Sequence, residues 1–226
     1  MKALFRFFIF LFLLFSSCIL SPTLPHPSSS DYSLVKINIG ISACAAFLIR
    51  PNIILTAAHC SRAHLPNIND TAKCGVNGDS AIILKWVLHP NSGPNTQTSD
   101  LALGLLSRPL DSCYKSTNIS APITGETLTF AAYGLSGSDG IYKWLKVSSA
   151  TIEGISLEGQ HIVVDASPDK FCRGESGTPI YNNQMEVIGL VSHGPLTNDG
   201  CSSVVHLVGL APNQDWIEKT IEILEK

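Results

Sequence analysis

The sequence has few charged residues, and they are not gathered by sign. Asp, Glu, Lys and Arg make up 15% of the 226 residues, and the net charge is -3. Because Lys and Arg form no basic stripe, a nucleic acid is not expected as a partner. The chain also lacks internal repeats of solenoid length and any low-complexity spacer after Ser33. Residues 33–226 are therefore expected to fold as one unit rather than as two small domains.

No apolar run in the sequence reaches the ~20 residues that a membrane-spanning helix requires. Lys2 and Arg6 precede the uncharged residues 7–15, a pattern typical of a secretory signal peptide, which we place at residues 1–18. The protein is therefore expected to be secreted or periplasmic. Small residues precede Cys18, so a lipid on Cys18 is an alternative in a bacterial source. Association with a membrane is expected only if Cys18 carries this lipid.

The sequence has no Cys-x-x-Cys pair, which argues against a compact metal site built from Cys44, His59 and Cys60. Of the seven cysteines, Cys18 falls in the predicted signal region. The remaining even number suits disulfides formed in an oxidising compartment.

Most of the chain consists of short apolar or alternating segments separated by turn residues, which predicts an all-β barrel architecture. The segments are residues 34–39, 45–49, 53–55, 81–88, 101–106, 127–133, 145–152, 161–164, 179–181, 186–191 and 203–208. Only residues 213–226 have helical spacing, with an apolar stripe that predicts a packing helix. Residues 19–32, rich in Pro and Ser, predict an extended N-terminal arm.

Residues 172–179, Cys-Arg-Gly-Glu-Ser-Gly-Thr-Pro, place Ser176 in a turn of small residues. A serine becomes a nucleophile when a base removes its proton and when N–H donors face the developing oxyanion. Gly174 supplies the backbone freedom for such a turn. Taken alone, these residues fit an ordinary Gly- and Pro-rich surface turn equally well.

Two other positions supply partners for Ser176. His59 follows the apolar residues 53–55, and Asp100 leads directly into the apolar residues 101–106. The chain order His59, Asp100, Ser176 is the order associated with chymotrypsin-like proteases and differs from that of subtilisins and α/β-hydrolases.

From about Ser33 to the C-terminus, the sequence resembles a trypsin/chymotrypsin-like (S1 family) secreted serine protease. The resemblance rests on an ordered set of stretches: Cys-Ala-Ala-Phe-Leu-Ile at 44–49, Thr-Ala-Ala-His-Cys at 56–60, Asp-Leu-Ala-Leu at 100–103, Ala-Ala-Tyr-Gly at 131–134, Ser-His-Gly at 192–194 and Trp-Ile-Glu-Lys-Thr-Ile at 216–221. It implies two six-stranded antiparallel β-barrels, the chymotrypsin-like double barrel, with a C-terminal α-helix.

The resemblance also implies a mechanism. His59 would take the proton of Ser176, Asp100 would orient the histidine ring, and the amides of Gly174 and Ser176 would bind the oxyanion. The reaction would be peptide-bond hydrolysis through an acyl-enzyme, with a protein or peptide as substrate and no metal or organic cofactor. A monomer is expected.

For the disulfides, the resemblance implies Cys44 with Cys60 and Cys172 with Cys201, which leaves Cys74 with Cys113. For the substrate pocket, it implies Lys170 at the base, Ser192 and Gly194 in one wall, and His193 where an aromatic residue usually lines the cleft. Lys170 at the base would repel cationic substrate side chains and attract carboxylates. The alternative is that Lys170 extends outward to Asp169 or Asp199, because a lone buried lysine is rare.

Two positions depart from the family pattern: Glu175 replaces the usual Asp before the nucleophile, and Thr178 replaces a small residue. No Ile-Val-Gly-Gly activation junction is present, although cleavage after Cys18 would make Ile19 an N-terminus that could pair with Glu175. These departures keep open the alternative of a protease-like binding protein without catalysis. An esterase is a further alternative, because the same triad attacks esters.

Overall fold

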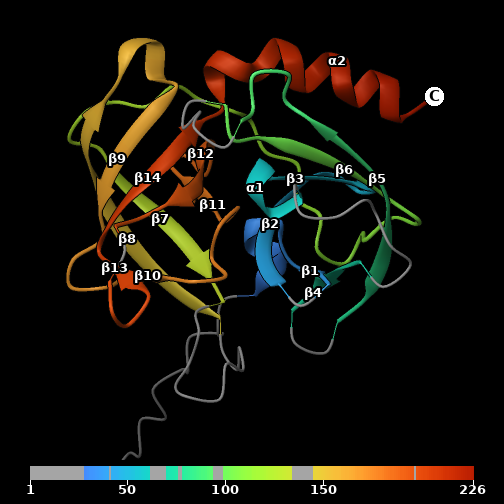
Figure 1. The fold of residues 1–226 in the computed structure, drawn as a ribbon, viewed down its shortest axis with the longest axis horizontal. Helices are drawn as coiled ribbons and strands as arrows, with labels where there is room; N and C mark the ends of the chain where they lie inside the picture. The colour runs from blue at the N-terminus through green and yellow to red at the C-terminus, as the bar shows by residue number, and fades with distance from the viewer. Residues whose placement is uncertain are drawn as a thin grey trace, which may run out of the picture.

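The computed structural model describes residues 28–40, 42–61, 70–75, 78–93, 99–133, 145–195 and 197–226 (Figure 1). The predicted signal peptide, Ile19 and most of the expected arm lie outside these residues. The end of the arm is not extended, because Ser29–Tyr32 forms a 3-10 helix, η1. The Ser28 amide, which donates to Asp31 Oδ2 at 2.9 Å, supports this turn. Within the described residues, no helix is both long enough and apolar enough to cross a membrane.

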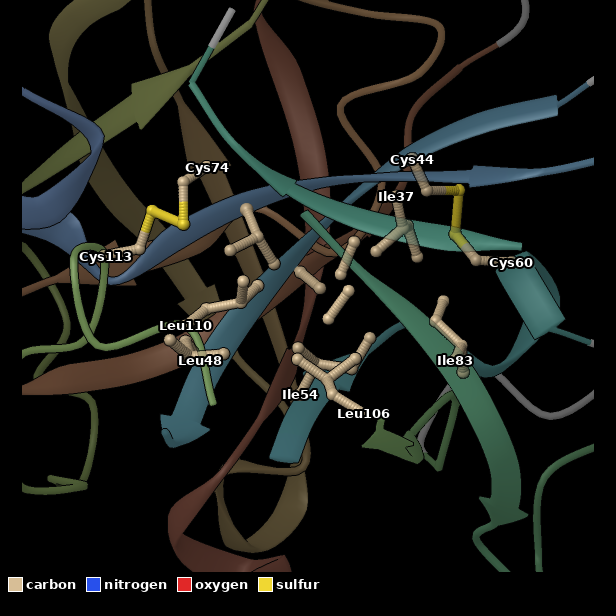
Figure 2. Packing of buried hydrophobic residues seen from close by; sticks show 14 of the residues in the cluster. Ile37, Cys44, Leu48, Ile54, Cys60, Cys74, Ile83, Leu106, Leu110 and Cys113 are labelled. Carbon is tan, nitrogen blue, oxygen red and sulfur yellow. A yellow bond between two sulfur atoms is a disulfide. The ribbon is translucent and has the colours of Figure 1, made fainter. Parts of the chain in front are cut away.

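The first half of the chain forms a closed six-stranded antiparallel barrel with strand order β1-β2-β3-β6-β5-β4. Its strands are β1 (Leu34–Ile39), β2 (Ser42–Arg50), β3 (Ile53–Thr56), β4 (Thr71–Cys74), β5 (Ser80–Leu88) and β6 (Ala102–Leu106). Alternate side chains point inward and fill the interior, as Figure 2 shows for Ile37, Leu48 and Ile54. Burial of this apolar surface holds the barrel closed.

The second half forms another closed six-stranded barrel, with strand order β11-β12-β14-β9-β8-β7. Its strands are β7 (Thr127–Ala132), β8 (Lys146–Ile155), β9 (His161–Asp165), β11 (Pro179–Tyr181), β12 (Val187–His193) and β14 (Val204–Gly209). Two further strands, β10 (Phe171–Cys172) and β13 (Cys201–Ser202), pair with each other. The predicted pair of antiparallel barrels is therefore confirmed.

A third group of buried side chains joins the barrels to the C-terminal helix α2 (Gln214–Leu224). Phe47 and Leu103 come from the first barrel, Leu190 and Val208 from the second, and Ile221 from α2. In Figure 1 the second barrel lies at the left, the first at the right, and α2 runs across the top. The remaining helical segments are α1 (Ala58–Ser61), η2 (Leu157–Gly159) and η3 (Ala211–Asn213).

The described part of the chain contains three disulfides, which confirms the expectation of disulfide bonding. They join Cys44 with Cys60, Cys74 with Cys113, and Cys172 with Cys201. The Cys44–Cys60 disulfide joins β2 to α1, and the Cys172–Cys201 disulfide joins β10 to β13. Figure 2 shows the disulfides of Cys44 and Cys74. Because Cys44 and Cys60 are bonded to each other, neither supplies a thiolate for a metal beside His59.

Candidate active site

His59 lies on α1, the single helical turn that follows β3. A backbone hydrogen bond fixes the position of this turn, because the Ala58 amide donates to the Asp100 carbonyl at 3.0 Å. On the other side, the hydroxyl of Thr56 donates to the Ala45 carbonyl at 2.7 Å. The histidine therefore stands on a turn that is anchored to two segments of the first barrel.

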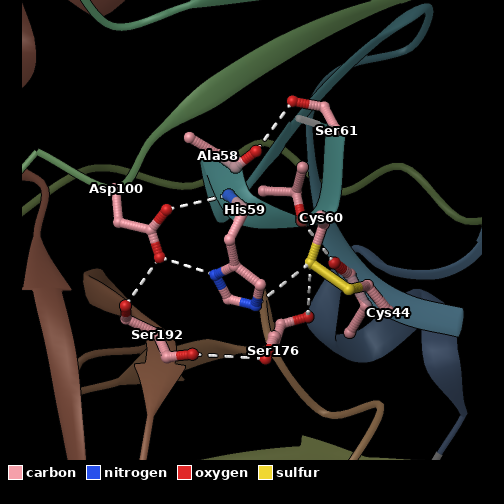
Figure 3. The surroundings of a disulfide bond; sticks show 10 residues. Cys44, Ala58, His59, Cys60, Ser61, Asp100, Ser176 and Ser192 are labelled. Carbon is pink, nitrogen blue, oxygen red and sulfur yellow. Dashed lines mark hydrogen bonds and ion pairs between the residues drawn. A yellow bond between two sulfur atoms is a disulfide. The ribbon is translucent and has the colours of Figure 1, made fainter. Parts of the chain in front are cut away.

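Asp100 is buried and accepts hydrogen bonds from three directions (Figure 3). Its Oδ2 lies 2.7 Å from His59 Nδ1 and 2.7 Å from the hydroxyl of Ser192, and its Oδ1 accepts the His59 amide at 2.9 Å. Burial alone would raise the pKa of Asp100, but the hydrogen bonds and the charge attraction of His59 lower it to about 2. An ionised carboxylate only accepts hydrogen bonds, so Nδ1 of His59 carries a proton. In the neutral ring Nε2 is then free to accept one.

Ser176 lies on the turn between β10 and β11, and backbone contacts hold this turn against both barrels. The Ala45 amide of β2 donates to the Ser176 carbonyl at 2.8 Å, and the Gly177 amide donates to Val191 of β12 at 2.7 Å. The Ser176 hydroxyl donates to the Ser192 carbonyl at 3.2 Å (Figure 3). Among the described residues it makes no hydrogen bond with His59. The His59–Asp100 pair is thus formed, while the serine hydroxyl is turned to another acceptor.

The backbone of this turn leaves specific N–H groups for a ligand. The amides of Arg173, Glu175 and Gly177 donate to backbone carbonyls. In the part of the chain that the structure describes, the amides of Gly174 and Ser176 have no such acceptor. Gly174 has φ +89°, a conformation that favours glycine.

Glu175 is buried beneath the turn, with only 1% of its surface exposed. One carboxylate oxygen accepts the Cys172 amide at 2.7 Å. Burial raises the pKa of Glu175 to about 7, and this hydrogen bond together with the charge of Lys146 opposes the rise. Glu175, whose side chain is one methylene longer than the usual Asp, thus accepts a hydrogen bond from a backbone amide of its own loop.

A cavity of about 250 Å³ opens beside His59 and Ser176. Ser192, His193 and Gly194, which the resemblance placed in a substrate pocket, all line it. Much of the rest of its lining is apolar and includes Phe171, Val191 and Val205.

Lys170 does not line this cavity, so its expected place at the base of a pocket is wrong, and the alternative of an outward lysine paired with Asp199 is confirmed. Its Nζ lies 3.1 Å from Asp199 Oδ2, and 52% of its side chain is exposed. The physical reason is the cost of removing an ammonium from water: the flexible lysine reaches solvent and a carboxylate instead. Buried Phe171, which stacks on Phe130, follows it in the chain.

Sequence reasoning also missed two features of the site. It placed Ser192 in a pocket wall, but it gave no indication that the Ser192 hydroxyl bonds Asp100. It gave no role to His161 and His206, which both lie half-buried on strands of the second barrel. The His206 ring stacks with those of His161 and His193. Both features depend on contacts between strands that are distant in the sequence, for which no local motif exists.

Comparison with protein-family models matches residues 25–217 to the family described as Trypsin. Among curated protein sequences no match was found. Kallikrein-related peptidase 10, solved as a complex with Zn2+, has a TM-score of 0.68 and 22% identity, covering 88% of this chain and 99% of that chain. The scabies mite inactivated protease paralogue S-I1 has a TM-score of 0.72 and 19% identity, covering 86% and 96%. Neuropsin, a serine protease of mouse brain, has a TM-score of 0.69 and 17% identity, with the same coverage. At these identities the structural likeness shows a shared fold.

Proposed function

Because the chain belongs to the trypsin family, whose model matches residues 25–217, we propose that it is a secreted serine endopeptidase acting through His59, Asp100 and Ser176. One observation carries this proposal. The His59 ring is hydrogen-bonded at 2.7 Å to a buried, ionised Asp100 and lines the same cavity as Ser176. The secreted location rests on the predicted signal peptide.

The proposed chemistry begins with rotation of the Ser176 side chain from the Ser192 carbonyl toward His59. His59 Nε2 takes the hydroxyl proton as Ser176 Oγ attacks the substrate carbonyl, and Asp100 stabilises the imidazolium that forms. The amides of Gly174 and Ser176 are the available donors for the oxyanion. His59 then gives its proton to the leaving amine, and water hydrolyses the acyl-enzyme by the same steps.

The cavity supports a preference for small apolar side chains before the cleaved bond. Phe171, Val191 and Val205 give it an apolar lining, and Arg173 is a cation in its wall. Arg173 would repel Arg and Lys side chains of a substrate, while Lys170 stays in solvent with Asp199. Trypsin-like cleavage after basic residues is therefore not expected, and a peptide-library profile of cleavage sites measures this.

A protein-binding function without catalysis is the second candidate. It is favoured by the hydrogen bond of the Ser176 hydroxyl to Ser192 rather than to His59. One structural neighbour is itself an inactivated protease paralogue. In this alternative the cavity would hold a peptide that is never cleaved.

The deciding experiment treats the purified protein with a fluorophosphonate probe, which labels an activated serine, and measures hydrolysis of an unfolded protein substrate. We expect labelling and hydrolysis in the native sequence and neither in Ser176→Ala. Asp100→Asn should reduce turnover by about 10⁴-fold, because it presents the wrong histidine tautomer. A folded native protein that neither reacts nor cleaves would favour the binding protein. Equal hydrolysis by Ser176→Ala would contradict the triad.

A further inference from the structure

Three histidines on neighbouring strands of the second barrel lie next to one another. His193 of β12 is paired directly with His206 of β14. His161 of β9 is paired with Val208, two residues beyond His206 on the same strand. Residues two apart on a strand share a face, so the three side chains stand on one face of three adjacent strands. The sequence keeps them on three separate segments, and the sheet brings them together.

The three rings are close enough to share one ligand. The ring centroids of His193 and His206 are 4.6 Å apart, and those of His161 and His206 are 4.7 Å apart. His206 Nδ1 and His161 Nε2 are 2.8 Å apart. One ring nitrogen from each histidine lies within 4.8 Å of the other two. All three side chains are half-buried, so solvent reaches the group.

We propose that His161, His193 and His206 form a binding site for a divalent transition-metal cation of the zinc type. Three imidazoles are a typical ligand set for Zn2+, which leaves a fourth position for water or another ligand. Two nitrogens bound to one Zn2+ at about 2.0–2.1 Å are about 2.9–3.4 Å apart, depending on the angle at the metal. The 2.8 Å separation of the His161 and His206 nitrogens is close to this range, so small ring rotations bring them onto a shared ion.

The hydrogen bonds around His193 favour the tautomer that binds a metal. The Ser192 hydroxyl gives its one proton to Asp100 and lies 3.1 Å from His193 Nδ1. Nδ1 must therefore be the donor in that contact, which leaves the lone pair of Nε2 available. A ligand histidine that donates its other N–H to a fixed oxygen is the usual supporting arrangement around protein metals.

Metal binding replaces the hydrogen bond between His161 and His206 and needs no loss of protons. In the hydrogen bond between His206 Nδ1 and His161 Nε2, one of the two neutral rings is the donor. When both of these nitrogens bind the ion, that ring carries its proton on its second nitrogen. Among the described residues, the other group with metal-ligand geometry is Cys44, His59 and Cys60. Its two sulfurs form a disulfide, so the histidine group is the better site.

The test measures Zn2+ binding by calorimetry and does not depend on peptidase activity. The protein carries Ser176→Ala to prevent self-cleavage, has no polyhistidine tag and is freed of metal by a chelator. We expect one equivalent of Zn2+ to bind. His161→Gln and His206→Gln should each weaken binding by at least about tenfold, since each removes a ligand. The control His89→Gln should bind like the parent, because His89 packs against Trp216, away from the group.

Circular dichroism checks that each variant is folded. Absence of binding to the parent at millimolar Zn2+, or equal binding by a folded His161→Gln/His206→Gln double variant, overturns the proposal. If a variant does not fold, the parent supplies the answer by NMR of its imidazole nitrogens during a Zn2+ titration. Shifts at His161, His193 and His206 support the site, and unchanged signals at these three overturn it.

Discussion

Two buried carboxylates near the nucleophile turn differ in their hydrogen bonding, and therefore in their charge. Asp100 accepts hydrogen bonds from His59 and Ser192, which outweigh its burial and lower its pKa to about 2. For Glu175 burial dominates over the Cys172 amide, and the pKa rises to about 7. Asp100 is thus charged throughout the neutral range, whereas Glu175 titrates within it.

The raised pKa of Glu175 predicts a pH dependence of stability. A carboxyl group with a higher pKa in the folded state favours folding while it is protonated. Its contribution is complete below its ordinary pKa of 4.5 and is lost as the pH rises through about 7. Urea unfolding of the Ser176→Ala protein should therefore show lower stability at pH 8 than at pH 5. Glu175→Gln should remove most of that difference, on the order of 3 kcal/mol.

The same measurement, made on the mature protein, tests the hypothesis that cleavage after Cys18 lets the Ile19 amino group pair with Glu175. If the mature N-terminus at Ile19 placed an ammonium beside Glu175, the carboxylate would be stabilised and its pKa would fall. The native protein would then be at least as stable at pH 8 as at pH 5, and Glu175→Gln would be destabilising at pH 8. That outcome would contradict a protonated Glu175.

At the residue scale, the sequence predicted where the main chain goes better than where side chains point. His59 and Asp100 were found because each adjoins an apolar strand segment, and the structure brings them together at 2.7 Å. Lys170 was misplaced because a position in a motif does not determine whether a long side chain turns inward or to solvent. The three-histidine group was missed because strand pairing, rather than local spacing, creates it.

At the scale of elements, the nucleophile turn fits closely against the first barrel. Gly177 has φ +86°. A Cβ there would lie far inside van der Waals contact with the Ala45 carbonyl oxygen and Thr56 Oγ1. The neighbouring Ser176 carbonyl accepts the Ala45 amide. The absence of a side chain at Gly177 therefore lets the turn from the second barrel approach β2.

Gly177→Ala should displace this turn and reduce both stability and the proposed activity. The matched control is Gly125→Ala, since Gly125 has φ +80° but open space around its would-be Cβ. The control should lose about 1–2 kcal/mol from backbone strain alone. Gly177→Ala should lose more, because steric overlap adds to strain, and fluorophosphonate labelling should fall with it. Equal losses of stability in urea unfolding, with labelling unchanged, would contradict this close fit.

The sequence predicted these elements unevenly. Apolar segments such as residues 34–39 and 53–55 correspond to strands β1 and β3, because burial leaves a clear sequence signal. The signal alternates in β1, where Lys36 and Asn38 are only half-buried, and is continuous in β3. Strand β4, with Thr71 and Lys73 half-buried, has a weak apolar pattern and was not predicted. The two-residue strands β10 and β13 are too short to carry a pattern of their own.

At the scale of the whole molecule, the candidate site lies between the two barrels. His59 and Asp100 belong to the first barrel, while Ser176 and Ser192 belong to the second. Their relative positions therefore depend on the apolar cluster that joins the barrels to α2. The sequence predicted α2 as a packing helix from its apolar stripe, but it did not show that the helix is part of the cluster shared by both barrels.

Two isoleucines on α2 allow this dependence to be measured within one helix. Ile221 is 4% exposed and belongs to the shared cluster, whereas Ile223 is 59% exposed. Ile221→Ala should lower the free energy of unfolding by about 2–5 kcal/mol, because it removes buried methyl and methylene groups and leaves a cavity. Ile223→Ala should change it by no more than about 0.5 kcal/mol.

Since the cluster contacts both barrels, Ile221→Ala should shift one cooperative transition rather than separate two. Urea unfolding followed by circular dichroism, compared with loss of fluorophosphonate labelling at each urea concentration, measures this directly. We expect the circular dichroism and labelling curves of Ile221→Ala to coincide, with a midpoint at a lower urea concentration than in the parent. The reason is that the barrels carrying His59 and Ser176 would lose their contact and unfold in the same transition. Two resolved transitions, or equal effects of the two substitutions, would show that the barrels are stable independently of α2.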